Sequence, residues 1–155
     1  MSANDPLPWI EPICKLIGKA VGAGIPVIGH CLGGQLMSKA LGGYVIRNPV
    51  KEIGWGEVWP AAGGAIKRWL GELAGENIPV FHWHGETFSL PPDSARLLES
   101  AWCANQAFAY GPHLGMQCHV EMLPEMIRNW CKGWDEEVRD LGTLPPSVQT
   151  PEAMQ

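Results

Sequence analysis

A cysteine in a glycine-rich stretch is the residue of this sequence best suited to covalent chemistry. The stretch reads GHCLGGQ at residues 29–35 and is the cysteine counterpart of GxSxG, in which a sharp strand-to-helix turn forces the nucleophile outward. Gly29 and Gly33 flank Cys31, and we expect both where the turn leaves no space for side chains. Cys31 would then begin a helix, whose dipole and free N–H groups lower the thiol pKa. The Leu32 N–H would point to the same place and could receive an oxyanion.

A thiolate nucleophile needs a base, and the base needs an orienting group. His119 and Glu121 are two residues apart in a stretch with strand-like alternation. Residues with this spacing face the same side of an extended chain, so Glu121 can hold one imidazole nitrogen while the other faces Cys31. Free cysteines are usually inert packing, and we expect that of the four others, Cys14, Cys103, Cys118 and Cys131.

A second group of ionisable residues, His82, His84 and Glu86, could imitate a metal site. Zinc sites usually need three or four ligands in recognised spacing, which this group lacks. The sequence therefore predicts no metal, and a structural or substrate-pocket role at a strand end for the histidines. Gly18-Lys19 lacks the earlier glycine of a phosphate-binding loop, so no cofactor is expected.

The elements around Cys31 follow from apolar spacing. Residues 9–24 have the periodicity of a helix, and residues 25–29 form a short β-branched run typical of a strand buried on both faces of a parallel sheet. A second helix is expected from about 33 to 41, ended by two glycines. This alternation of strand and helix predicts an α/β fold with helices on both faces of the sheet.

The remaining chain is harder to interpret. Residues 44–92 are rich in Gly, Pro and Trp and predict short strands and turns, whereas 115–121 alternate like an extended segment. A last helix is expected from Pro124. The domain would then span residues 1–141, followed by a mobile tail over 142–155, which has little to bury.

Composition limits the partners. Hydrophobic residues make up 46% of the 155 residues, and 16 acidic against 11 basic residues give a net charge of -5 with no basic stripe. This argues against nucleic acid and against anionic membranes, and favours a small polar substrate. The chain shows no apolar run of membrane-span length, and its five cysteines form no CxxC pair, so a reducing cytoplasm is the expected setting.

At these residues the sequence resembles the class I, or triad-type, glutamine amidotransferases, and within them the free-standing GMP-synthetase-like subgroup. GHCLGGQ matches the family's GxCxGxQ, and residues 115–121 match a motif close to GxQxHxE. HWHGETFSLP at 82–91 looks like the family's HGD-type loop, and KEIGW at 51–55 looks like a segment of that subgroup. The resemblance implies a flavodoxin-like fold with a mostly parallel sheet. The chain opens as though inside the family's glycine-rich oxyanion loop, so the first βα units are expected to be missing.

The resemblance also implies a reaction. Cys31 would attack the side-chain amide of glutamine, and the γ-glutamyl thioester would be hydrolysed with help from His119 and Glu121. The Leu32 N–H, Gln35 and the loop at Gly85 and Glu86 would hold the substrate, and ammonia would pass to a partner synthetase.

Three alternatives stay open: a γ-glutamyl peptide hydrolase, another cysteine hydrolase, and a non-catalytic truncated remnant. An α/β-hydrolase is disfavoured because its acidic residue precedes its histidine, whereas Glu121 follows His119. An uncovered sheet edge would also favour pairing into a homodimer.

Overall fold

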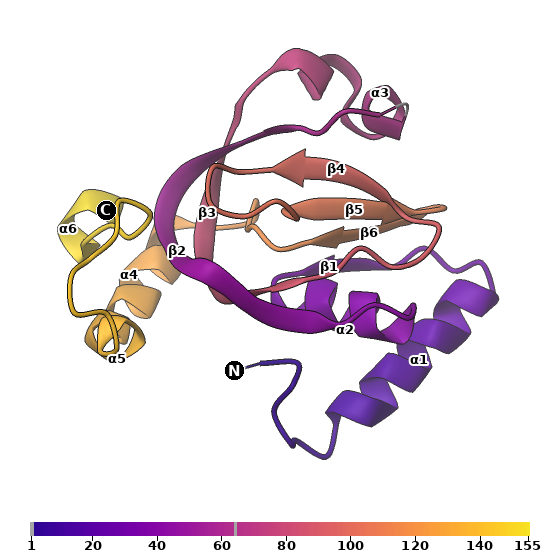
Figure 1. Ribbon diagram of the computed structural model, residues 1–155, viewed down its shortest axis with the longest axis horizontal. Helices are drawn as coiled ribbons and strands as arrows, with labels where there is room; N and C mark the ends of the chain where they lie inside the picture. The colour runs from indigo at the N-terminus through magenta and orange to yellow at the C-terminus, as the bar shows by residue number, and fades with distance from the viewer. Residues whose placement is uncertain (1, 64) are drawn as a thin grey trace.

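A computed structural model describes residues 2–63 and 65–155 of the chain. Strands and helices alternate at first, two long strands occupy the middle, and short helices end the chain (Figure 1). In chain order the elements are α1 (Ile10–Gly22), β1 (Ile28–His30), α2 (Leu32–Ala40), β2 (Val45–Pro60), α3 (Ala65–Leu70), the 3-10 helix η1 (Gly71–Gly75), β3 (Ile78–Phe88), β4 (Ala95–Glu99), β5 (Ala107–Tyr110), β6 (His113–Met116), α4 (Pro124–Cys131), α5 (Trp134–Val138) and α6 (Pro151–Met154).

The strands form one sheet in the order β1-β6-β5-β4-β2-β3. Helices cover both of its faces, as expected, but the sheet is mixed and not mostly parallel. Only β1 and β6 pair in parallel among the described strands, and the other four pairings are antiparallel. The short connections explain this difference. Two residues link β5 to β6, with Gly111 at a φ of 56°, and a two-residue connection permits a hairpin but no parallel crossover.

The strand expected at 25–29 forms later and at an edge. β1 covers Ile28–His30 and has one neighbour, β6, so its side chains are not buried on both faces. Ile25 and Ile28 are 58% and 63% exposed. The parallel pairing nevertheless brings the end of β1 beside the end of β6, which is what positions Cys31.

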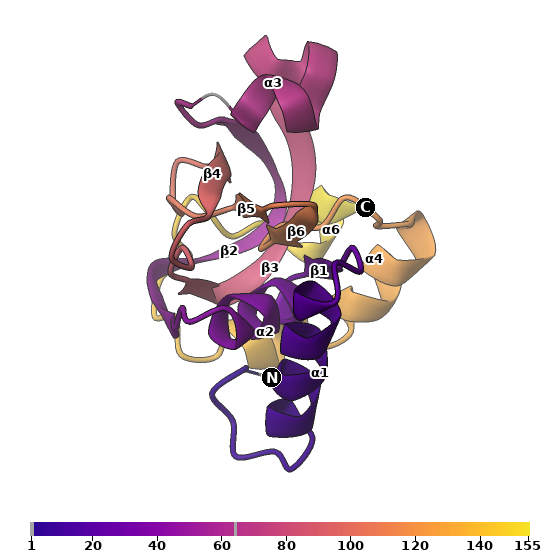
Figure 2. The ribbon, with the colours of Figure 1, turned by 90° about the vertical axis from the view of Figure 1, so that its right-hand side faces the viewer.

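Alternating residues of β5 divide the main core into two layers. Phe108 packs with Phe88 and with α1 and α2 on one face, whereas Ala107 and Ala109 lie on the other face with α3 and η1. Figure 2 shows α3 on the opposite side of the sheet from α1 and α2. Gly115 of β6 is required here, because a Cβ at this position would lie 2.4 Å from the Phe108 ring.

The middle of the chain forms longer strands than the sequence predicts. β2 runs for 16 residues and β3 for 11, and the two pair antiparallel over most of their length. A register irregularity between Arg47 and Glu52 lets the ribbon bend. This ribbon carries much of the candidate site, because Glu52 lies opposite His84 in its register.

The C-terminal segment differs from the expected mobile tail. Residues 142–155 pack against β2 through an isolated bridge between Ile53 and Val148, and α6 buries Met154, which is 3% exposed. Gln149 also hydrogen-bonds the backbone of Trp55 in both directions. A few apolar side chains are enough, because they complete a cluster that already contains Ile53 and residues of α4 and α5.

Candidate active site

Cys31 occupies the sharp turn between β1 and α2. Its φ of 49° and ψ of -110° are unusual for a residue with a side chain, and such a conformation costs on the order of 1–3 kcal/mol. A Cβ on Gly29 would lie 2.5 Å from the Gly33 carbonyl carbon, so Gly29 is crowded as predicted. The second crowded position is Gly34 and not Gly33, where a Cβ would contact no other part of the protein within 4 Å. A Cβ on Gly34 would lie 2.4 Å from the Met116 carbonyl oxygen.

Hydrogen bonds fix this turn to the end of β6. The Cys31 N–H donates to the Met116 carbonyl at 2.8 Å. The Gln117 side-chain amide lies 3.6 Å from Cys31 Sγ, and its carbonyl oxygen accepts from the Gln35 amide at 3.2 Å. Gln35 and Gln117 are both buried. Gln35 therefore acts on the thiol through Gln117, besides lining the cavity beside it.

His119 and Glu121 follow β6 at the same edge. The backbone of His119 pairs with Phe81 of β3 through two hydrogen bonds of 2.9 and 2.8 Å. Its Nδ1 lies 2.6 Å from Glu121 Oε1, while Glu121 Oε2 accepts from the Val120 N–H at 3.0 Å. His119 Nε2 is buried and has no hydrogen-bond partner among the described residues. The imidazole is thus held at one nitrogen and free at the other.

The protonation states follow from these contacts. Burial lowers the pKa of His119, against the opposing effect of Glu121. Burial also disfavours the Glu121 carboxylate, but the His119 hydrogen bond and backbone N–H hold the pKa of Glu121 below its usual value. At neutral pH His119 is therefore uncharged, with the Nδ1 proton donated to an ionised Glu121. Nε2 then presents a lone pair, as a general base requires.

The structure corrects the expectation of a low thiol pKa. Burial raises the pKa of Cys31, and the Leu32 N–H and the Gln117 amide only partly oppose this. Glu121 lies close enough to disfavour the thiolate further. The helix N-terminus does not outweigh the loss of water, so the resting cysteine is a thiol.

A cavity of about 550 Å³ opens at Cys31. The predicted substrate-binding residues Gln35, Gly85 and Glu86 all line it, together with Cys31. The structure thus brings these positions together with the cysteine. Leu32 follows Cys31 at the first position of α2, with its N–H directed to the thiol.

Charged residues that were not predicted from the sequence also line this cavity. Arg47 and Lys51 supply positive charge, and Glu137 and Asp140 supply negative charge. Lys51 Nζ lies 3.0 Å from Glu137 Oε1, and Arg47 makes no ion pair among the described residues. Lys51 opens the KEIGW segment, which gave it no role in the cavity, and the other three belong to no motif. They meet because β2 and the segment around α5 approach the cavity from different parts of the chain.

The side chains of His82, His84 and Glu86 do not form one cluster. His84 Nδ1 lies 3.1 Å from the Glu86 backbone carbonyl, so the Glu86 side chain is not the third member. The carboxylate beside the two histidines is Glu52 of β2. It belongs to the KEIGW segment, thirty positions before His82, and nothing in that segment links it to the histidines. Only the pairing of β2 with β3 reveals it.

The fold and the site define an α/β protein with a cysteine on a strand-to-helix turn and a His–Glu pair at the neighbouring strand end. A sequence profile of the glutamine amidotransferase class-I family matches residues 4–129. The chain belongs to this family, as its motifs predict.

Curated relatives agree with this assignment. The chain is 36% identical over 126 residues to the glutamine amidotransferase-like protein YfeJ of Salmonella typhimurium, covering 81% of this chain and 52% of YfeJ. It is 33% identical over 107 residues to the GMP synthase of Colwellia psychrerythraea, covering 64% of this chain and 20% of that protein. The chain thus spans about half of the first relative and a fifth of the second.

Solved structures confirm the flavodoxin-like amidotransferase fold. A glutamine amidotransferase from Methylobacillus flagellatus matches with a TM-score of 0.89 and 44% identity, over 99% of this chain and 63% of that one. A glutamine amidotransferase from Thermotoga maritima matches with a TM-score of 0.80 and 29% identity, over 99% and 64% of the two chains. In the part of the chain that the structure describes, no helix is long and apolar enough to cross a membrane.

Proposed function

We propose that this chain hydrolyses the side-chain amide of glutamine through a γ-glutamyl thioester on Cys31. The observation that carries the proposal is the state of His119. Its Nδ1 is held 2.6 Å from Glu121, and its Nε2 is buried and unpartnered within the described residues. Such a base needs a proton donor at Nε2, and Cys31 stands at the adjoining strand end.

The reaction would begin with proton transfer from the Cys31 thiol to His119 Nε2 as the sulfur attacks the amide carbon. A C–S bond forms, and the carbonyl oxygen takes the negative charge close to the Leu32 N–H. His119 then returns the proton to the leaving nitrogen, the C–N bond breaks and ammonia departs. Water, deprotonated by the same imidazole, attacks the thioester and releases glutamate and the thiol. Glu121 stabilises the imidazolium formed in each half.

The cavity suits glutamine because it carries both signs of charge. The α-carboxylate of the substrate would pair with Arg47, the cavity-lining cation that makes no ion pair among the described residues. Its ammonium would face Glu86 or Asp140. Binding by both ends would place the side-chain amide at Cys31.

The ammonia would be delivered to a partner synthetase, a proposal supported by the resemblance to GMP synthases. A reducing compartment such as the cytoplasm suits the chemistry, since all five cysteines are free thiols.

The test is to incubate the purified chain with glutamine and to measure glutamate release, alongside labelling by a glutamine-like diazoketone. We expect release from the wild type, none from Cys31→Ala, and the label on Cys31. Cys131→Ser is the matched control, because Cys131 is also half-buried and lies outside the cavity. A label chiefly on Cys131, or glutamate release by Cys31→Ala, contradicts the proposal.

A further inference from the structure

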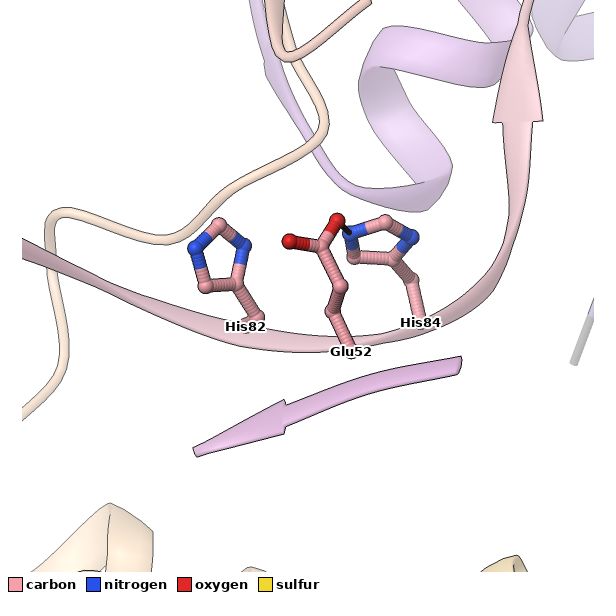
Figure 3. Close-up of side chains that lie close together, drawn as sticks. All are labelled: Glu52, His82 and His84. Carbon is pink, nitrogen blue, oxygen red and sulfur yellow. Dashed lines mark ion pairs between the residues drawn. The ribbon is translucent and has the colours of Figure 1, made fainter. Parts of the chain in front are cut away.

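Two buried histidines and a buried glutamate converge on the β2–β3 ribbon. Glu52, His82 and His84 are 3%, 3% and 5% exposed. Figure 3 shows the Glu52 carboxylate between the two imidazole rings, with one nitrogen of each ring facing it. Ligand atoms of all three side chains lie within 4.8 Å of one another. The reaction proposed at Cys31 does not use these three side chains, although His84 also lines the cavity there.

The hydrogen bonds of His84 define its free nitrogen. Its Nδ1 lies 3.1 Å from the Glu86 carbonyl, which can only accept, so Nδ1 carries the proton. Nε2 of the neutral ring then points a lone pair at Glu52 Oε2, 3.1 Å away. Nε2 of the neutral His84 ring and Oε2 of Glu52 are both acceptors, so in this buried position a cation or a proton must lie between them. A histidine that donates one N–H to a backbone carbonyl is the usual arrangement of a metal ligand.

His82 has even fewer partners. Neither of its ring nitrogens makes a hydrogen bond within residues 2–63 and 65–155, although the side chain is buried. An unpaired buried polar group costs about 1–3 kcal/mol. The residue opposite it in the ribbon is Gly54, and a Cβ on Gly56 would come within 2.9 Å of its ring. Gly56 thus leaves room for an imidazole whose nitrogens have no hydrogen-bond partner among the described residues.

Two hydrogen-bond donors hold the Glu52 carboxylate, one at each oxygen. Ser100 Oγ donates to Oε1 at 2.8 Å, and the Gln106 amide donates to Oε2 at 2.7 Å. Both donors are buried. Hydrogen bonds of this kind orient carboxylate ligands around metal ions. The carboxylate is therefore fixed in direction while it faces the histidines.

We propose that Glu52, His82 and His84 bind one zinc ion. Two imidazole nitrogens and a carboxylate oxygen, with a fourth position for water, form a known zinc ligand set. The 3.1 Å between His84 Nε2 and Glu52 Oε2 is close to the ~3.3 Å edge of a tetrahedron with bonds of about 2.0–2.1 Å. The His82 ligand nitrogen lies within 4.8 Å of the other two ligand atoms and would have to move closer to close the third edge. The ion would neutralise Glu52 and fasten β2 to β3, whose Phe81 pairs with His119.

Zinc binding to the purified full chain, stripped with a chelator, tests this site without any need for glutaminase activity. We expect one zinc per chain by elemental analysis after dialysis and a rise in melting temperature on zinc addition. His82→Gln, which keeps much of the side-chain volume, should weaken binding by about tenfold or more. X-ray absorption of the wild-type zinc form should show nitrogen and oxygen neighbours at about 2.0–2.1 Å and no sulfur at about 2.3 Å.

Cys31→Ala is the control, since zinc can also bind a thiolate beside a histidine. This variant should bind zinc as the wild type does. The proposal is overturned if the wild type binds no zinc at micromolar concentration, if Cys31→Ala abolishes binding, or if X-ray absorption finds sulfur. Unchanged affinity in a folded His82→Gln also overturns it. Should His82→Gln fail to fold, the wild-type absorption spectrum alone decides. If that spectrum lacks nitrogen and oxygen neighbours at about 2.0–2.1 Å, a proton shared by His84 and Glu52 takes the place of the ion and the proposal is overturned.

Discussion

Adding one methyl group at each of two adjacent glycines of α2 should have opposite effects. Gly34 approaches β6 so closely that a Cβ would lie 2.4 Å from the Met116 carbonyl oxygen and 3.0 Å from its nitrogen. Both contacts are with backbone, which cannot move aside as a flexible side chain can. At Gly33 the same Cβ would find no atom within 4 Å. Both residues lie inside the helix, so the effect of helix propensity is shared.

The expected magnitudes follow from these contacts. Gly33→Ala should raise the free energy of unfolding by about 0.5–1 kcal/mol, because alanine loses less backbone entropy in a helix. Gly34→Ala has the same favourable effect on backbone entropy, but its methyl group must push α2 away from β6. Such overpacking typically lowers the free energy of unfolding by about 1–3 kcal/mol. For a chain of this size 1 kcal/mol shifts the melting temperature by about 2–4 °C. Thermal unfolding followed by circular dichroism, with urea titration as a second measure, resolves such a difference.

Gly34→Ala should also affect the Cys31 thiol. Met116 O accepts the Cys31 N–H at 2.8 Å, so moving Met116 disturbs the turn that holds the cysteine. Gly34→Ala should therefore slow labelling of Cys31 by the diazoketone even where the protein is folded. If Gly34→Ala is as stable as Gly33→Ala and labels as fast as the wild type, the close approach of α2 to β6 is refuted.

Three further predictions concern the base, the pH dependence and the C-terminal segment. His119→Ala should reduce the rate of glutamine hydrolysis by about 10²–10⁴-fold. Glu121→Gln should reduce that rate less, since Glu121 only orients the imidazole and stabilises the imidazolium. Equal losses of rate would contradict these roles. Because the pKa of His119 is lowered from 6.5, kcat/KM of the wild type should fall only below that pH. Glu121→Gln should shift this fall in kcat/KM to still lower pH, because it removes the charge that favours imidazolium. A fall that begins above pH 6.5 in the wild type contradicts the assignment. Met154→Ala should lower the free energy of unfolding by about 2 kcal/mol, measured by urea unfolding. The control Glu152→Ala, at an exposed position of the same helix, should change it by less than about 0.5 kcal/mol. Equal effects would mean that α6 does not pack on β2.

The candidate site was predictable where its chemistry is local in sequence. Cys31 and its turn need only the adjacent strand, glycine and helix, and His119 and Glu121 need only a spacing of two in an extended segment. Each of these two arrangements is specified by a segment of seven residues, 29–35 and 115–121. The structure keeps both arrangements and joins them through the parallel pairing of β1 and β6.

What the sequence could not predict depends on contacts between distant residues. Gly34 is restricted by Met116, eighty-two positions later, so the motif alone points to the wrong glycine. Glu52 meets His84 only because of the β2–β3 register and its irregularity after Arg47. Low local hydrophobicity after Gly142 suggests a free tail, yet Val148 completes a cluster formed elsewhere.

The raised pKa of Cys31 changes the role of the His–Glu pair. A preformed thiolate would need a permanently charged imidazolium, but burial lowers the pKa of His119 and raises that of Cys31, so the resting pair is neutral. In the proposed reaction, the proton would then move when substrate is bound and its carbonyl can take up the charge. A thiolate generated from a thiol of higher pKa is also the stronger nucleophile. Glu121, 2.6 Å from Nδ1, acts mainly once His119 has become an imidazolium. On this proposal, the raised pKa of Cys31 would slow indiscriminate reaction of the thiol and leave its activation to the substrate.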